Sequence, residues 1–234
     1  MKKIGIIGGM GPKATCDLMQ KIIMCTDAKN DQEHIHILVD CNTNIPDRTE
    51  AIFGRGESPV PEIVNSAKNL QSMGADLLVM SCNTTHYFYD KVAKHIDIEL
   101  LNMPDETAIY LKNMGVKKVG VLATDGTIQS GIYEKSLKKQ GIEAIYPSSE
   151  NQKFIMELIY DYIKSGCDDY YDSKLKDILD ELKEKGAEKI ILGCTELPIA
   201  FERLGVNDDL VDPTLILACS TVYFAGAKLN AKVI

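Results

Sequence analysis

The chain has 234 residues, of which 45% are hydrophobic, and a formal net charge of −8 at pH 7. A chain of this length buries roughly 70% of its unfolded surface, enough for one large domain or two small ones. The acidic balance argues against nucleic acid as a partner, because phosphate binding needs a concentrated basic face and none is evident in the sequence.

The start of the chain and its cysteines predict a cytoplasmic protein. Met1-Lys2-Lys3 runs directly into an apolar strand, and no apolar run reaches the roughly 18 residues of a membrane span. The seven cysteines form no Cys-x-x-Cys pair, which argues against structural zinc, and their odd number fits a reducing compartment. We therefore expect a soluble protein with no membrane partner.

Short apolar runs alternate with amphipathic stretches along the whole chain, which is typical of α/β folds with parallel sheets. Strands are predicted at residues 4–7, 35–39, 77–80, 119–123, 144–146 and 189–192. Helices are predicted at about 13–28, 59–73, 84–95, 105–114, 127–140, 150–165, 172–185 and 213–227.

Two pairs of similar segments indicate an internal duplication. Residues 2–7 match residues 117–122, which lie 115 positions later. The strand that ends in Cys82-Asn83-Thr84 is repeated by the strand that ends in Cys194-Thr195-Glu196, 112 positions later. Each half is therefore expected to be one α/β domain.

The predicted fold class is α/β, with two similar doubly wound domains of mainly parallel sheets related by a pseudo-twofold axis. The first domain comprises residues 1–103 with a returning C-terminal helix at 213–234, and the second comprises residues 104–212. Ligands of such sheets bind beyond the carboxyl ends of the strands, so we expect the active site in the cleft between the domains.

Cys82 and Cys194 are the strongest chemical candidates. Each lies at a predicted strand-to-helix junction, where the positive end of the helix favours a thiolate and lowers the thiol pKa from about 8.5. Each is followed by hydrogen-bonding residues, and the arrangement occurs twice. Two such thiols can remove a proton from one side of a carbon acid and deliver one from the other. The remaining cysteines are interpreted as residues that fill the core: Cys16, Cys25, Cys41, Cys167 and Cys219.

The glycine-rich segment Gly8-Gly9-Met10-Gly11-Pro12 follows the first predicted strand. It lets the backbone approach an anionic ligand near a helix start, although a plain tight turn explains the same residues. Ala14 stands at the third glycine position of a dinucleotide-binding motif. Nucleotide binding is disfavoured but stays open, because that motif tolerates alanine there.

Several isolated polar residues are weaker candidates. Arg48, in a turn-like loop after the second strand, could hold a carboxylate bidentately or be solvated. Lys164 could bind an anion or stabilise a helix C-terminus. Thr124 and Thr127 are possible carboxylate donors. His86, four residues after Cys82, could pair with that thiol. Alternatively, the two residues could lie on one face of a helix without forming a functional pair.

At these residues the chain resembles the cofactor-independent aspartate/glutamate racemase family, most closely its aspartate racemase branch. The motifs run in order over nearly the whole chain: Gly8-Gly9-Met10-Gly11-Pro12-Lys13-Ala14-Thr15, Ile45-Pro46-Asp47-Arg48-Thr49, Cys82-Asn83-Thr84, Gly126-Thr127-Ile128-Gln129-Ser130 and Gly193-Cys194-Thr195-Glu196-Leu197-Pro198.

The resemblance implies a two-domain fold, often a homodimer, that needs neither pyridoxal phosphate nor a metal. It makes Cys82 and Cys194 the acid/base catalysts, and Arg48 and Lys164 the residues that bind a carboxylate. Glu196 stands where glutamate racemases carry histidine, which favours the aspartate branch. The other substrate-lining candidates are Met10, Asn83, Thr84, Thr85, Thr127 and Thr195, with Thr124 and Glu196 beside them.

The predicted function is interconversion of L- and D-aspartate by two cysteine thiols without a cofactor. The alternatives on the same scaffold are racemisation of glutamate or of a broad set of amino acids, hydantoin racemisation and maleate isomerisation. A non-catalytic amino-acid-binding protein is a further alternative, although binding alone needs neither thiol.

Overall fold

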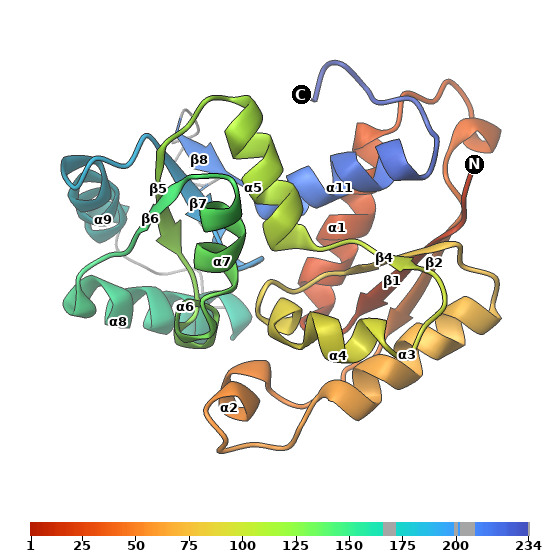
Figure 1. Cartoon of the computed structure of the whole chain (residues 1–234), viewed down its shortest axis with the longest axis horizontal. Helices are drawn as coiled ribbons and strands as arrows, with labels where there is room; N and C mark the ends of the chain where they lie inside the picture. The colour runs from red at the N-terminus through yellow and green to blue at the C-terminus, as the bar shows by residue number, and fades with distance from the viewer. Residues whose placement is uncertain (166–171, 199–200, 202–208, 234) are drawn as a thin grey trace. The chain divides into compact units, whose positions relative to one another are not determined.

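The computed structural model describes residues 1–165, 172–198, 201 and 209–233 of the chain (Figure 1). The chain forms two compact units, of which the first comprises Met1–Glu106 with Thr214–Ile234 and the second Thr107–Pro213. The N-terminal and C-terminal segments of the chain thus belong to the same unit.

The first unit is built on a parallel four-stranded sheet in the order β2-β1-β3-β4. Its strands are β1 (Ile4–Gly8), β2 (Ile37–Cys41), β3 (Leu77–Met80) and β4 (Glu99–Leu100). Its helical elements are α1 (Pro12–Cys25), η1 (Asp31–Glu33), α2 (Arg48–Ile52), α3 (Val60–Ser72), the 3₁₀ turn η2 (Thr84–Phe88), α4 (Tyr89–Ala93) and α11 (Pro213–Phe224), and α5 (Met103–Asn113) leads into the second unit.

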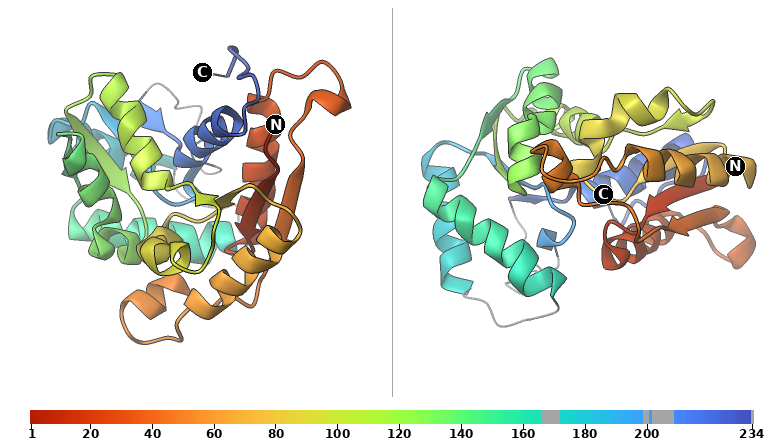
Figure 2. Two further views of the ribbon diagram at one scale, coloured as in Figure 1. Left: turned by 45° about the vertical axis from the view of Figure 1, so that its right-hand side comes forward. Right: turned by 90° about the horizontal axis from the view of Figure 1, so that it is seen from below.

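Both faces of this sheet are covered, because alternate strand residues point to opposite sides. Ile6 and Val79 belong to an apolar cluster with residues of α1 and α11, whereas Ile7 and Met80 belong to a second cluster with residues of α3 and α4. Burial on both sides explains why the strands read as continuous apolar runs. Figure 2 shows α1 and α11 next to one another.

The second unit repeats this architecture with the strand order β6-β5-β7-β8, again all parallel. Its strands are β5 (Lys118–Leu122), β6 (Glu143–Ile145), β7 (Lys189–Leu192) and β8 (Leu210–Val211). Its helices are α6 (Asp125–Ser130), α7 (Ile132–Lys139), α8 (Ser149–Glu157), the π-helical segment η3 (Leu158–Lys164) and α9 (Asp172–Glu184). Two parallel α/β sheets of equivalent order confirm the predicted fold class and explain the repeated sequence segments.

The structure differs from the sequence prediction in a few elements. The edge strands β4 and β8 are not among the predicted strands, because two residues are too few for a periodic signal. The helix predicted at 127–140 is divided at Gly131, whose φ of 64° ends α6. Arg48, predicted to lie in a loop, begins the short helix α2, which the Asp47 side chain caps.

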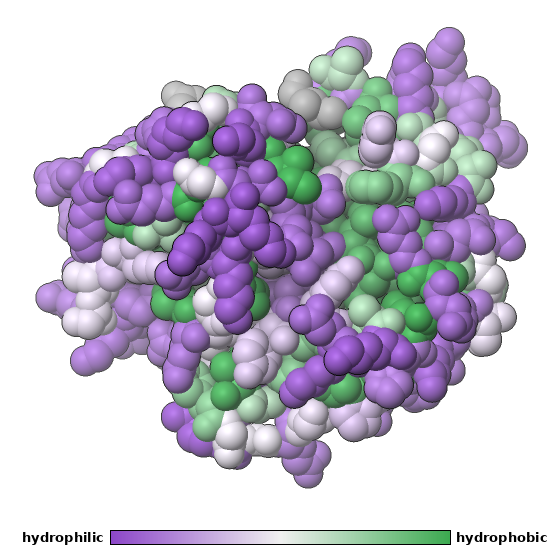
Figure 3. Space-filling view, in the orientation of Figure 1, coloured by the Kyte–Doolittle hydropathy of each residue, from purple (hydrophilic) through white to green (hydrophobic). Residues whose placement is uncertain are grey.

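Hydrophilic side chains dominate the face of the molecule shown in Figure 3, and smaller apolar patches interrupt them. Some large apolar side chains are exposed, among them Met24 on α1 and Tyr223 on α11. No helix in the described part of the chain combines the length and the apolar character needed to cross a membrane.

Candidate functional site

The glycine-rich loop and the Cys82 segment are held together at the carboxyl ends of β1 and β3. The Ser81 amide donates to the Ile7 carbonyl over 3.2 Å, and the Ser81 and Thr15 hydroxyl oxygens lie 3.1 Å apart. The Thr15 hydroxyl also accepts from the Gly9 amide over 2.9 Å. Thr15 and Ser81 were not predicted as site residues, although both lie within or next to the quoted motifs.

The backbone conformation at position 9 and the atoms around it both require a glycine there. Its φ is +89°, and a Cβ atom there would lie 2.3 Å from the backbone carbonyl of Asn42. Only glycine fits this conformation and this contact without displacing the loop after β2. The motif is therefore more than a plain turn, because it packs one loop of the site against another.

The residues that follow β3 are almost fully enclosed. Cys82 has 7% of its surface exposed, and Asn83, Thr84 and Thr85 are also buried as they lead into and begin η2. The Thr85 hydroxyl donates to the Met10 sulfur over 3.1 Å. The structure thus brings the predicted residues Met10 and Thr85 into contact and places Cys82 in the same apolar cluster as Met10.

Arg48 ties the same loops together through its guanidinium group. Its Nη1 donates to the carbonyls of Pro46 and Ile45 over 2.9 and 3.3 Å, and its Nη2 donates to the Met10 carbonyl over 3.4 Å. Its Nε is buried and has no hydrogen-bond partner among the described residues. The carbonyls therefore hold both Nη nitrogens, and the buried Nε–H is a donor that no described residue accepts.

His86 contacts the backbone of Cys82. Its Nδ1 lies 3.0 Å from the Cys82 carbonyl oxygen and 3.2 Å from that of Asn83. Burial lowers the pKa of His86 to about 4, although backbone hydrogen bonds partly offset this effect. The ring is neutral near pH 7 and holds the start of η2 in place.

The buried His86 should make stability depend on pH. The folded-state pKa of about 4 lies below the ordinary value of 6.5, so the unfolded chain binds the proton more tightly. The stabilisation is complete above pH 6.5 and is lost as the pH falls through 4, amounting to about 3 kcal/mol. Urea unfolding at pH 7 and pH 4 should show this loss in the wild type and not in His86→Gln.

The exposed His95 provides the control for this measurement. His95→Gln should retain the wild-type difference in unfolding free energy between the two pH values. An equal acid loss in His86→Gln and the wild type would contradict the assignment to His86.

The second unit repeats the arrangement of the first at the carboxyl ends of β5 and β7. The Gly193 amide donates to the Leu122 carbonyl over 2.6 Å, which places the Cys194 segment beside the loop that contains Thr124. The Thr124 hydroxyl caps α6 by accepting from the Thr127 amide over 3.3 Å, and it donates to the Thr127 hydroxyl over 3.1 Å. The two predicted threonines therefore form one cluster.

Cys194 shares a buried hydrogen-bond group with its neighbours. Its thiol donates to Oε2 of Glu196 over 3.0 Å, and the Thr195 hydroxyl donates to the same oxygen over 3.1 Å. Cys194 is 6% exposed and Glu196 8% exposed. The carboxylate is thus in direct contact with the thiol, which the sequence spacing alone did not predict.

The surroundings of Cys194 raise the pKa of its thiol, whereas a lowered pKa was expected from the sequence. Burial raises the pKa of Cys194 well above its ordinary value, and the negative charge of Glu196 raises it further. The expectation of a thiolate at this strand-to-helix junction is therefore wrong for Cys194, because burial and the Glu196 carboxylate both disfavour the charged form.

Lys164 acts on the Cys194 thiol through its positive charge. It ends η3 with an exposed side chain, and its Nζ lies 4.3 Å from the centre of the Tyr160 ring. Its positive charge lowers the pKa of Cys194 and so partly offsets the effect of Glu196. The structure therefore places Lys164 within electrostatic reach of the second thiol.

Tyr133 is a further neighbour of the Cys194 segment, and it was not predicted as a site residue. A Cβ atom on Gly193 would lie 3.2 Å from the Tyr133 ring, so this buried ring packs beside the glycine that precedes Cys194. Burial raises the pKa of Tyr133 well above its ordinary value. Helical periodicity predicts only that such a residue is apolar core.

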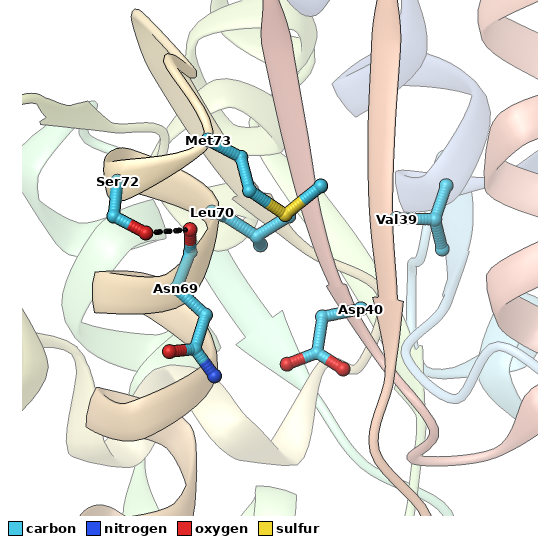
Figure 4. Close-up of a pocket in the computed structure, with 6 residues that line it drawn as sticks. All are labelled: Val39, Asp40, Asn69, Leu70, Ser72 and Met73. Atoms are coloured by element: carbon cyan, nitrogen blue, oxygen red, sulfur yellow. Dashed lines mark hydrogen bonds between the residues drawn. The ribbon is translucent and has the colours of Figure 1, made fainter.

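Other regions of the described chain contribute little to the site. A shallow hollow between β2 and α3 is lined by none of the predicted site residues (Figure 4); its lining is Val39, Asp40, Asn69, Leu70, Ser72 and Met73. Within the described residues, no three His, Cys, Asp or Glu side chains are grouped so that they could hold a metal ion. Cys167, interpreted as a core residue, lies outside the described residues. The same interpretation is wrong for Cys16 and Cys41, which are exposed, because Cys16 lies off the buried face of α1 and Cys41 ends the edge strand β2.

Comparison with known families identifies the family to which the chain belongs. Residues 7–221 match the model of the Asp/Glu/hydantoin racemase family. The chain belongs to this family. The match covers both units and both cysteine motifs, and it confirms the resemblance that the motifs indicated.

Individual relatives agree with this assignment. The racemase chain is similar to the Picrophilus torridus aspartate racemase, with a TM-score of 0.84 and 33% identity over 99% of this chain and 97% of the other. It is 31% identical to the broad specificity amino-acid racemase RacX of Bacillus subtilis (strain 168), over 94% of this chain and 96% of RacX. The glutamate racemase of Francisella tularensis shares the fold, with a TM-score of 0.67 and 20% identity over 95% of this chain and 80% of that one.

Proposed function

We propose that this racemase interconverts L- and D-aspartate by a two-base mechanism in which Cys82 and Cys194 are the acid/base pair and no cofactor takes part. The observation that carries the proposal is the repetition of one arrangement in both units: a buried thiol directly after an equivalent strand, with polar residues next to it. Binding an amino acid requires no thiol at either place.

In the proposed reaction one thiolate removes the α-proton of the bound amino acid. The other thiol then donates its proton to the opposite face of the carbanion, which inverts the centre. Each turnover exchanges the protonation states of the two cysteines, so the enzyme is ready for the opposite enantiomer. Because its pKa is raised, Cys194 starts as a protonated thiol in the free enzyme and acts first as the donor.

Glu196 supports the reverse direction in this proposal. Its carboxylate lies 3.0 Å from the Cys194 sulfur and can accept the thiol proton, leaving a Cys194 thiolate that removes an α-proton.

The thiols alone do not account for a useful rate. A turnover near 1 s⁻¹ corresponds to a barrier of about 17 kcal/mol. General acid/base catalysis supplies about 10²–10⁴-fold, whereas the α-proton of an amino acid is very weakly acidic. Preorganised donors must therefore stabilise the charge that develops on the α-carboxylate. We assign this role to Asn83, Thr84 and Thr195, which adjoin the two cysteines.

Two cations suit an acidic substrate. Arg48 keeps its Nε edge for a carboxylate while its other nitrogens hold the surrounding loops. Lys164 adds a positive charge within reach of Cys194. We propose that these cations bind the side-chain carboxylate of aspartate, and that Met10, Thr85, Thr124 and Thr127 line the substrate.

The proposal is tested by incubating the purified protein with L-aspartate in D₂O without added cofactor. Loss of the α-proton signal in NMR together with decay of optical rotation is the expected result. Exchange with retained rotation would indicate that protons are removed and returned on only one face of the α-carbon. The absence of both exchange and decay of rotation would contradict aspartate as the substrate.

Broad-specificity racemisation is the second candidate function, favoured by the similarity to RacX over nearly the whole chain. The same exchange assay with glutamate and with neutral amino acids separates the two. A kcat/KM for neutral amino acids equal to that for aspartate would favour the second candidate and exclude a substrate-binding role for the two cations.

Replacing Glu196 should change the titration of the neighbouring thiol. Glu196→Gln removes a negative charge beside Cys194, so the pKa of Cys194 should fall. The variant also loses the proton acceptor, so racemisation that begins at Cys194 should slow by about 10²-fold. The pH dependence of iodoacetamide labelling of Cys194, followed by peptide mass spectrometry, reports the pKa directly.

The matched control is Glu184→Gln, an exposed carboxylate at the end of α9 in the same unit. It should leave both the labelling profile of Cys194 and the rate unchanged. An unchanged labelling profile in Glu196→Gln would contradict the assigned interaction.

A further inference from the structure

Two cysteines that the proposed mechanism does not use lie in contact in the first unit. Cys25 is the last residue of α1, and Cys219 lies in the middle of α11. Their sulfur atoms are 3.2 Å apart, and neither cysteine is in a disulfide bond. They are separated by 194 positions in the sequence, so this contact exists only because α11 packs on α1.

The surroundings hold the two sulfurs at this distance. Ile22 of α1 and Val222 of α11 are fully buried in one apolar cluster with Cys25. Beyond the helices, the Asn230 amide donates to the Cys25 carbonyl over 2.8 Å, and Thr26 forms a β-bridge with Leu229. A disulfide bond is about 2.05 Å long, so the sulfurs need to approach by only about 1 Å.

The two thiols differ in a way that assigns each a role. Cys25 is completely buried, whereas Cys219 is only partly buried and can meet a small oxidant. The hydrogen bond from Cys25 lowers the pKa of Cys219, which favours the thiolate at the accessible position. This is the arrangement of an attacking thiol beside a resolving thiol.

We propose that Cys25 and Cys219 form a reversible disulfide and constitute a redox modification site separate from the proposed catalytic thiols. The oxidant is hydrogen peroxide. The Cys219 thiolate attacks one peroxide oxygen, the O–O bond breaks, and the leaving hydroxide takes up a proton to form water. The Cys25 sulfur then attacks the resulting sulfenic acid, the S–O bond breaks, and a second water leaves with the Cys25 proton. A small dithiol reverses the reaction by thiol–disulfide exchange.

The disulfide would join the first and last helices of the unit. It closes a loop between positions 25 and 219, and a cross-link over such a long loop restricts the unfolded chain strongly. We expect the thermal unfolding midpoint to rise by about 5–15 °C on oxidation and to return to its original value after treatment with dithiothreitol.

The test uses the full chain treated with a small excess of hydrogen peroxide, then alkylated and digested with trypsin without reduction. The expected product joins peptide 22–29, which contains Cys25, to peptide 204–228, which contains Cys219. Mass spectrometry identifies this species, and dithiothreitol should remove it.

Matched variants make the result specific. Cys219→Ser should lose both the cross-linked peptide and the rise in unfolding midpoint, whereas Cys16→Ser, which removes an exposed thiol from the same helix α1, should retain both. Recovery of Cys25 and Cys219 as alkylated or over-oxidised residues, with no joined peptide in the wild type, would overturn the proposal. The wild-type peptide map decides the question even if a variant folds poorly.

Discussion

Replacing either Cys82 or Cys194 by serine is expected to abolish net racemisation of aspartate. Each thiol supplies a proton transfer that general acid/base catalysis accelerates by about 10²–10⁴-fold, and a serine hydroxyl is a far weaker acid and base. Inversion requires both transfers, so the loss of either group should lower kcat by at least that factor. Polarimetry with each pure enantiomer measures the loss.

The two-base model makes a sharper prediction for hydrogen exchange. A single-serine variant keeps one thiol, which can remove and return the α-proton on one face only. Cys82→Ser and Cys194→Ser should therefore exchange the α-proton of opposite enantiomers in D₂O, each with retained configuration. NMR of L- and D-aspartate incubated separately distinguishes the four combinations.

The exposed Cys16 supplies the control for these variants. Cys16→Ser should racemise aspartate at the wild-type rate, which shows that loss of a thiol elsewhere is harmless. Near-wild-type racemisation by either Cys82→Ser or Cys194→Ser would refute the model. Exchange of the same enantiomer by both variants would also contradict it.

Replacing Arg48 by lysine is expected to lower kcat/KM for aspartate by about 10²–10⁴-fold. Lysine keeps the charge but loses the planar fork, so two hydrogen bonds to the carboxylate are lost, each worth about 1.5–3 kcal/mol. The carbonyls of Pro46 and Met10 also lose their guanidinium partner. Initial rates of circular dichroism change over a range of aspartate concentrations separate the effects on KM and kcat.

Arg55 provides the matched control on the same segment. It is exposed and pairs with Glu50 over 2.7 Å at the surface, where an ion pair contributes little. Arg55→Lys should leave kcat/KM within about twofold of the wild type. If Arg48→Lys lowers the rate for neutral amino acids as strongly as for aspartate, Arg48 maintains the loops and does not recognise the side chain.

The alternation of apolar runs and amphipathic stretches correctly predicted most of the fold. Strands buried on both faces produce unbroken apolar runs such as Leu77–Met80, and these need no tertiary information to be recognised. The repeated segments also indicated two similar units, because a duplicated sequence pattern folds into a duplicated arrangement of strands. The short strand β4 escaped prediction because pairing with β3, and not its own pattern, creates it.

The candidate site was predictable in part, for a different reason. Cys82 and Cys194 stand out because each combines a thiol with polar neighbours at a strand end, which is a local pattern. Their protonation states cannot be predicted from this local pattern. The raised pKa of Cys194 depends on burial and on the direction of the Glu196 carboxylate, and neither can be read from residue spacing.

Periodicity and adjacent residues were therefore enough to predict the class of the fold, the duplication and the candidate chemical groups. Which of these groups contact one another depends on the packing of the folded chain. Arg48 contacts Met10 across 38 positions, and Cys25 contacts Cys219 across 194 positions. Such contacts are set by how helices and loops pack on the sheets, and packing brings together residues whose separation along the chain carries no signal.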